Sequence, residues 1–490
     1  MAGGRRTRRG SAGGSLAVSV LALDVGEWAE QNLGGCDWGD VRRTRRAVTV
    51  ARQRAEHPDG STPDQAEDGS DLKAMYRLFD AEEATFTALA TPHWIRTRSL
   101  ARGTVLLIGD TTETDFGIRR AVAGLGPTGE GYGLGFFRHS SMMVAAGRGE
   151  ILGLAGQELF DRQPVPKPEN SYQKRQRSRE SEVWGRVVEL VGPPAEGVRF
   201  VHVFDRGADN LDVFCHCRAQ RTDGVIRAAQ WHRVVEESHV VEQADIAPTD
   251  ERGGSQRLSL RAALTRRPLS GTYALSVGAT QDHAARTARM QVRFARVTIR
   301  RPKRRTKSQR QIDFQELTQG VVETRAVNPP QGVQPRHWVL WTSLPVMSFD
   351  EAWRILEYDA RRWRIEEFHK AIKTGCRLEA RPFMEAHRLE AVARFTCLLA
   401  VRRLPLKTVA TTTPDLPAER VVPQIWRKML GALRKRKRTT ARDFFRHLAG
   451  LGGFLMRKRD GNPGWITLWR GLDKLLLAIR GYTAIKQKCG

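Results

Sequence analysis

An acid set among cations on one predicted helix is the most informative pattern in this sequence. The segment 358–373 is expected to be helical, and at about 100° per residue Arg362, Glu366, Lys370 and Lys373 fall within about 80° of one another. One carboxylate surrounded by cations suits a helix that holds a divalent metal ion beside a phosphate backbone. The alternative is a solvated face with ordinary i,i+4 ion pairs.

Two further acids each follow an apolar run that is typical of a buried strand. Asp110 comes just after the run 105–108, and Asp205 comes after the run 199–204. A carboxylate in such a place is costly unless it is paired, hydrogen-bonded or bound to metal. Either acid alone could cap a turn. Together with Glu366 they form an oxygen-ligand set that suits two Mg²⁺ ions, or Mn²⁺, about 4 Å apart, as in-line phosphodiester displacement requires.

Composition narrows the class of partner. The chain has 490 residues, a formal net charge of +27 and a pI near 10.7. A surface this positive favours a polyanion, either nucleic acid or an anionic membrane. No apolar run reaches the roughly 18 residues needed to span a bilayer. The arginines at 5–9 before a short apolar run resemble an export leader, but no small-x-small cleavage site follows, so a basic arm, or a start placed too far upstream, is the preferred interpretation.

Cysteine usage indicates a reducing compartment. Six cysteines in a chain of this length do not make a disulfide framework. Cys215, His216 and Cys217 look like a metal clip, but consecutive strand residues point to opposite faces, so we expect buried strand cysteines instead. The predicted location is the cytoplasm.

The elements that would position the acids can be read along the chain. Residues 24–100 are expected to be helical, with one helix starting after Asp40 and carrying Arg42, Arg43, Arg45 and Arg46. The expected strands are 105–108, 136–146, 150–157 and 199–204, with a helix at 180–191. Residues 210–345 alternate like β structure around a basic loop at 300–310, in which seven of eleven residues are Lys or Arg. Helix returns from 349 to about 403, followed by a linker at 408–423 and a basic helical tail.

Short motifs recur in a specific order from end to end. They are Gly39-Asp40-x-Arg42-Arg43-Thr44-x-Arg46, Tyr76-Arg77, Asp110-Thr111-Thr112, His139-Ser140, Glu180-Ser181-x-x-Trp184, Asp205-Arg206-x-Ala208-Asp209, Trp338-x-x-x-Thr342, the run of ten residues 362–371, and Leu451-Gly452-Gly453-Phe454. By these motifs and their order, the chain resembles a bacterial insertion-sequence transposase of the DDE class, in the hairpin-forming group with the YREK signature (the IS-four family).

The resemblance implies roles for individual residues. Asp110, Asp205 and Glu366 match the catalytic, metal-binding triad. Arg362 and Lys373 match the signature residues that grip phosphates, and Lys370 is expected to act with them. Trp338 matches the aromatic on which a flipped base stacks. Tyr358 lies one residue away from the signature tyrosine, whose matching position is Asp359, so its role as a phosphate ligand is the weakest part of the match.

The resemblance also implies an architecture. The fold class is α/β: an RNase H-like mixed sheet with a β-rich insertion, flanked by helical N- and C-terminal domains. We expect a disordered basic arm at 1–20, a DNA-end-binding domain at 21–100, a catalytic domain at 101–390 with its insertion at about 210–345, and a C-terminal dimerisation and DNA-contact domain at 391–490.

The predicted function is cut-and-paste transposition. The partners would be transposon-end DNA with terminal inverted repeats, target DNA and a second copy of the chain in a synaptic complex, with no membrane and no small-molecule substrate, in the nucleoid. Arg42, Arg43, Arg45 and Arg46 would read the terminal repeats. Two alternatives stay open: a DNA-binding regulator without catalysis, and a plain two-metal nuclease without strand transfer.

Overall fold

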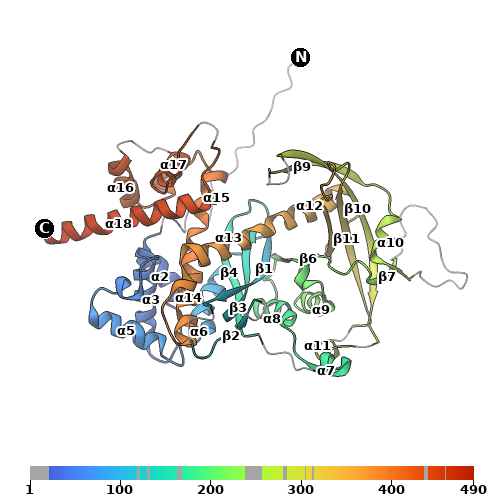
Figure 1. Ribbon diagram of the computed structural model, residues 1–490, viewed down its shortest axis with the longest axis horizontal. Helices are drawn as coiled ribbons and strands as arrows, with labels where there is room; N and C mark the ends of the chain where they lie inside the picture. The colour runs from blue at the N-terminus through green and yellow to red at the C-terminus, as the bar shows by residue number, and fades with distance from the viewer. Residues whose placement is uncertain are drawn as a thin grey trace, which may run out of the picture.

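The computed structural model describes residues 21, 23–117, 122–129, 133–162, 168–237, 257–279, 284–303, 305–311, 314–434, 440–457 and 460–489. The predicted basic arm at 1–20 lies outside these residues. The fold is mixed α/β, with one large mixed sheet and helices at both ends of the chain (Figure 1). No described helix combines the length and apolar character required to cross a membrane.

The N-terminal segment is helical, as predicted. Its helices are α2 (Val25–Leu33), α3 (Val41–Glu56), α4 (Thr62–Gln65), α5 (Gly69–Phe79) and α6 (Phe86–Ser99). Asp40 starts α3 because its side chain accepts a hydrogen bond from the backbone N–H of Arg42 at 2.8 Å. The helix therefore begins at the residue that the sequence indicates.

The sheet joins the core and the insertion into one layer. Its strands are β1 (Thr104–Asp115), β2 (Gly126–Thr128), β3 (Gly133–Ala145), β4 (Ile151–Phe160), β5 (Arg199–Phe204), β6 (Asp223–Arg227), β7 (Val234–Glu237), β8 (Arg257–Ser259), β9 (Gly271–Val277), β10 (Arg286–Arg300), β11 (Glu316–Ala326) and β12 (His337–Thr342). The order is β2-β3-β1-β5-β6-β12-β11-β10-β7-β8, with β4 beside β3 and β9 beside β10. Strands β1, β5 and β6 are parallel neighbours, and β12 returns antiparallel to β6. The insertion is thus attached to the core by backbone hydrogen bonds.

Both faces of the core strands are buried. In β1, Leu106 and Ile108 pack into one hydrophobic cluster, while Val105 and Leu107 pack into the other. A strand covered on both sides has no polar face, which explains its continuous apolar run. The predicted strands at 105–108, 136–146, 150–157 and 199–204 are all confirmed, although β3 ends one residue before the predicted end and β4 begins one residue after the predicted start.

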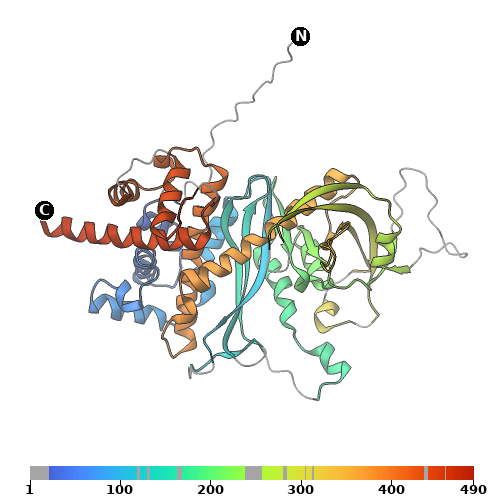
Figure 2. The ribbon, with the colours of Figure 1, turned by 45° about the horizontal axis from the view of Figure 1, so that its top comes forward.

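The remaining α-helices follow along the chain. They are α7 (Ser171–Gln176), α8 (Val183–Val191), α9 (Leu211–Ala219), α10 (Leu260–Thr265), α11 (Lys307–Gln311), α12 (Phe349–Ala360), α13 (Arg364–Lys370), α14 (Ala386–Arg403), α15 (Pro405–Thr412), α16 (Gln424–Arg434), α17 (Ala441–Leu451) and α18 (Trp465–Cys489). Figure 2 shows α12 and α13 crossing the sheet from the insertion toward the N-terminal helices, and α18 extending past those helices to the C-terminus.

Two predictions about secondary structure were wrong. Cys215 and Cys217 lie on α9 and not on a strand, because Asn210 caps that helix by accepting from the backbone N–H of Val213 at 3.0 Å. Both thiols are nevertheless buried and free, since α9 packs among α8, α11 and β6. The linker predicted at 408–423 is helical up to Thr412, at the end of α15.

The predicted continuous helix at 358–373 is also interrupted. A 3₁₀ turn at Arg361–Trp363 separates α12 from α13, and a π turn at Ala371–Gly375 follows α13. A 3₁₀ turn advances more degrees per residue than an α-helix and a π turn advances fewer. The angular positions calculated for a regular helix therefore do not hold across this segment.

Candidate active site at the edge of the core sheet

A cleft of about 600 Å³ opens where β1 and β5 stop pairing. Parallel pairing between these strands ends at Ile108, two residues before Asp110. Asp205 directly follows β5 and lines the same cleft. The lining also includes Thr111, Trp184 and Lys373. The structure therefore brings two of the three predicted acids, and one predicted cation, into one cleft.

Strand alternation explains why the acids meet. Asp110 continues the face of β1 that buries Leu106 and Ile108, and Asp205 continues the face of β5 that buries Val201 and Val203. All four apolar residues belong to one cluster. Helix α13 covers that same face, because its Ile365 and Phe368 belong to the cluster too. Glu366 is thereby carried over the ends of the two strands.

The pKa of Asp110 indicates that several acids lie close together. Burial, together with the nearby charges of Asp205 and Glu366, raises the pKa of Asp110 to about 7, against the lowering effects of the Thr111 N–H and of Arg362. A buried carboxylate with two acidic neighbours lacks a sufficient counter-charge. The oxygen donors and the surplus negative charge both fit a divalent cation.

Glu366 is engaged with a cation of its own helical segment. Its Oε1 lies 2.7 Å from a terminal nitrogen of Arg362, whose side chain is buried. Across the part of the chain that the structure describes, no three His, Cys, Asp or Glu side chains are grouped so that they could hold one metal ion. Asp205 and Glu366 both act on the pKa of Asp110, but the three carboxylates do not converge on one point, and Glu366 is held by an ion pair.

His369 lies beside Asp110, a neighbour that sequence reasoning did not assign to it. Its Nδ1 lies 4.0 Å from Oδ2 of Asp110, and its ring is almost fully buried. Burial, and then the nearby charge of Arg138, hold the pKa of His369 well below its usual range. The imidazole is therefore neutral. Its position three residues after Glu366, one helical turn on, is the signal that could have indicated it.

A layer of aromatic rings supports the opposite side of β1. Thr111 hydrogen-bonds Nδ1 of His139 through its hydroxyl at 2.8 Å, and the His139 ring meets Trp184 at a centroid distance of 4.4 Å. Gly109 allows this packing, because a Cβ there would lie 2.4 Å from the ring of Phe204. Side-chain packing and this hydrogen bond therefore hold the strand that carries Asp110 in place.

The two predicted lysines are separated. Lys373 lines the Asp110–Asp205 cleft and lies 3.5 Å from Glu379. Lys370 instead lines a small cavity of about 50 Å³ against Trp465 and Trp469 of α18. The expectation that they share a face was wrong, because the π turn after Lys370 changes the phase of the helix.

The signature region around Tyr358 is organised by another pair. Tyr358 is buried in the core. Asp359, which occupies the signature tyrosine position, accepts two hydrogen bonds of 2.8 Å from Arg227 on β6. The Arg227 guanidinium also lies 6.0 Å from the ring centroid of Trp338, which is half-buried on β12. An Arg–Asp pair thus connects the predicted tyrosine and tryptophan positions.

The four arginines at the start of α3 differ in their surroundings. Arg46 pairs with the largely buried Asp71 of α5, and Arg43 lies 2.7 Å from Glu83. Arg42, 85 % exposed, pairs only with Asp40 at 3.1 Å, and Arg45 is exposed with no ion pair to another described residue. Arg42 and Arg45 are therefore the most exposed of the four and the most accessible to a ligand.

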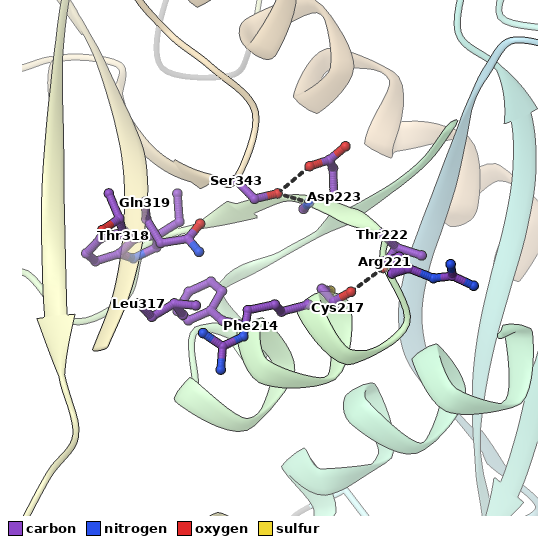
Figure 3. Close-up of a pocket in the computed structure, with 12 residues that line it drawn as sticks. Phe214, Cys217, Arg221, Thr222, Asp223, Leu317, Thr318, Gln319 and Ser343 are labelled. Carbon is purple, nitrogen blue, oxygen red and sulfur yellow. Dashed lines mark hydrogen bonds between the residues drawn. The ribbon is translucent and has the colours of Figure 1, made fainter. Parts of the chain in front are cut away.

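A second pocket of about 280 Å³ lies at the junction of core and insertion. Figure 3 shows it between α9 and the strands β11 and β12, with the Ser343 hydroxyl donating to Asp223 at 2.8 Å. None of the predicted site residues lines it. It therefore belongs to the packing of the insertion rather than to the acidic cleft.

Two family models match this chain, one near each end. Residues 25–84 match the model described as transposase DNA-binding, and residues 398–488 match the transposase Tn5 dimerisation domain. The first match includes α3 with its exposed arginines, and the second runs from the end of α14 through most of α18. Together the matches indicate a DNA transposase with a DNA-binding domain and a dimerisation domain.

Proposed function

We propose that this chain is a cut-and-paste DNA transposase of the hairpin-forming YREK group, with an RNase H-like core. The supporting observation is the shared cleft of Asp110 and Asp205 beneath the helix that carries Glu366. The matches at the two ends support DNA binding and dimerisation but do not cover this cleft. The catalytic assignment therefore depends on the cleft itself.

Asp110, Asp205 and Glu366 are the proposed ligands for two Mg²⁺ ions. Bound ions would activate the attacking oxygen and stabilise the leaving oxygen of a phosphodiester displacement. On binding metal, Glu366 would give up its ion pair with Arg362. Arg362 would then be free to hold a DNA phosphate. Neutral His369, 4.0 Å from the Asp110 carboxylate, adds no positive charge beside it. Lys373, at the cleft wall, holds a second phosphate.

The proposed reaction has four phosphoryl transfers at this one site. Water nicks the transposon end, and the freed 3′-hydroxyl attacks the opposite strand to form a hairpin. A second water opens the hairpin, and the 3′-ends then attack target DNA. Trp338 would stack the base that the hairpin flips out. Arg42 and Arg45 would contact the terminal repeats, in the nucleoid of the cytoplasm.

Two measurements test the proposal. With duplexes that carry the inverted repeats flanking the gene, Mg²⁺ should support nicking by the wild type and not by Glu366→Ala or Asp110→Ala. Mg²⁺ should also raise the melting temperature of the wild type, but not of the Asp110→Asn/Asp205→Asn double variant. Cleavage by Glu366→Ala at the wild-type rate would show that the site assignment is wrong.

A non-catalytic DNA-binding regulator is the second candidate. The Glu366–Arg362 ion pair favours it, since that pair occupies the third proposed ligand. The regulator would bind the terminal repeats in a band-shift assay and leave them uncut under every divalent ion. Binding together with Mg²⁺-dependent nicking would exclude this candidate.

A further inference from the structure

A basic groove, separate from the two pockets described above, lies on the β insertion. It has a volume of about 570 Å³ and opens between β7, the end of β10 and the start of α9. Its charged lining consists of five cations and one acid: Arg233, Arg257, Arg300, Arg301, Lys303 and Glu236. None of these residues lines the Asp110–Asp205 cleft. In Figure 1 the strands concerned lie on the side of the molecule away from the helical ends of the chain.

One buried acid fixes two exposed arginines at this groove. Glu236, with a side chain only 8 % exposed, accepts from Nε of Arg257 at 3.0 Å and from Nε of Arg300 at 2.8 Å. The two arginine side chains are 64 % and 53 % exposed. Glu236 bonds each guanidinium through its Nε, so the terminal nitrogens of Arg257 are not used by this acid, while one terminal nitrogen of Arg300 lies 3.5 Å from Glu316. The arginines are thus held in place before any ligand arrives.

The positive charge of the groove exceeds its internal counter-charge. Arg257 and Arg300 share Glu236, and Arg300 also lies 3.5 Å from Glu316. Lys303 is exposed and has no ion pair with another described residue. A polyanion is the class of ligand that this surplus attracts, and arginines held in this way match phosphate oxygens.

The floor of the groove is tied to the chain segment that carries Asp205. Arg233 donates to Asp209 at 2.7 Å, and Asp209 follows Asp205 by four residues. The Asp209 carboxylate is fully buried and also accepts from the backbone N–H groups of Ala229 and Gln230 at 2.7 and 2.9 Å. Gly207 lines the cleft and Leu211 lines the groove, so the segment that follows β5 contributes to both sites within five residues.

We propose that this groove binds the phosphodiester backbone of the DNA that adjoins the segment cut in the cleft. The inference rests on the proposed function. Two sources share this chemistry: the flanking DNA outside the transposon end before cleavage, and target DNA during strand transfer. The groove increases the affinity for DNA and determines where the DNA runs on the protein surface. It takes no part in the chemical step.

The test compares two full-length double variants with the same change in charge. Arg257→Gln/Lys303→Gln removes two groove cations. Arg289→Gln/Arg325→Gln removes two exposed cations of β10 and β11 that do not line the groove. Binding is measured without divalent ions, as the dependence of log K on log salt, on a random-sequence duplex and on end duplexes with and without flanking DNA. The groove variant should lower the slope by about 2, while the control leaves it unchanged.

The substrates identify the source of the DNA. A loss confined to the flanked end duplex assigns the groove to flanking DNA, and a loss on the random duplex with weaker strand transfer of pre-cut ends assigns it to target DNA. Equal loss from both double variants, no loss from either, or equal loss on an end trimmed at the cut would each overturn the proposal. Failure of Mg²⁺-dependent nicking by the wild type would count against the proposed function alone, since these binding assays contain no metal.

An opposite change gives an independent check. Glu236→Gln keeps a hydrogen-bonding side chain of the same size but removes the one acid of the groove. Tighter binding of the same duplexes is expected, because the surplus positive charge of the groove rises by one, and a thermal melt of the variant accompanies the binding measurement. Weaker binding by a variant that melts normally would contradict the proposal.

Discussion

Nδ1 of His369 lies 4.0 Å from Oδ2 of Asp110, so an uncharged ring borders the most crowded carboxylate of the cleft. Burial and surrounding cations keep His369 neutral, while burial and acidic neighbours raise the pKa of Asp110 to about 7. The protein thus leaves the negative charge at Asp110 uncompensated by its nearest histidine. That arrangement has a measurable consequence for stability.

Asp110 should make the metal-free protein less stable as pH rises from about 4 to about 7. Its folded-state pKa lies above the unfolded value of about 3.9, so in this range the native state binds more protons than the unfolded state. Asp110→Asn should therefore be the more stable protein at pH 8, by up to a few kcal/mol, and equal to the wild type near pH 4. Thermal melts in chelator across this range provide the measurement. Exposed Asp350→Asn is the matched control, and a pH-independent difference for Asp110→Asn would contradict the prediction.

The Arg227–Asp359 pair should be structural and strongly coupled. Arg227→Met leaves the Asp359 carboxylate, 9 % exposed, without its partner, which typically costs about 3–5 kcal/mol. Adding Asp359→Leu removes the unpaired charge and should recover most of that loss. Denaturant unfolding of both single variants and of the double variant gives the coupling energy. If the loss of unfolding free energy in the double variant equals the sum of the losses in the two single variants, the two side chains are not coupled and the prediction is wrong.

The arginines of α3 should divide into DNA contacts and structural residues. Arg42→Gln and Arg45→Gln should each lower the salt slope of end binding by about 1 and leave the melting temperature unchanged. Arg46→Gln should lower the melting temperature, because Asp71, 13 % exposed, then loses its ion-pair partner. Fluorescence anisotropy at several salt concentrations, together with thermal melts, separates the two groups. A normal melt for Arg46→Gln would refute the structural assignment.

Trp338 should matter more for the hairpin than for the first nick. Base stacking on an aromatic side chain is typically worth about 1–3 kcal/mol, which corresponds to about a 5- to 150-fold change in rate. Trp338→Ala should slow hairpin formation by such a factor and leave nicking close to the wild-type rate. Trp231→Ala, which removes a half-buried insertion tryptophan whose ring lies 4.7 Å from that of His337, serves as the control. Equal losses in both steps would identify Trp338 as ordinary core.

Helix α18 should carry a self-association surface. Leu477 and Ile485 are 61 % and 65 % exposed and lie about 80° apart on the helix. Leu477→Glu/Ile485→Glu should convert a dimer on DNA into a monomer, as measured by analytical ultracentrifugation. Exposed Thr483, on a different face, provides Thr483→Glu as the charge control. A dimer that persists in the double variant would place the interface elsewhere.

Local pattern was sufficient for much of the architecture. The apolar run before Asp110, the run before Asp205 and the cap at Asp40 each depend on contacts within a few residues, and all three appear where they were predicted. Strand alternation then places Asp110 and Asp205 on one face. The mixed α/β class follows from the same patterns, because periodicity and capping are properties of neighbouring residues.

Other features depended on tertiary contacts. Lys370 and Lys373 part because a π turn inside a packed helix alters its phase, and Arg46 is held by Asp71 from another helix. The placement of His369 beside Asp110, and of the groove cations around Glu236, joins residues that are distant in the sequence. Residue types and spacing determined which groups could carry the chemistry. Only the packing of strands and helices decided which of those groups lie together, because ion pairs and burial between distant segments leave no periodic signal in the chain.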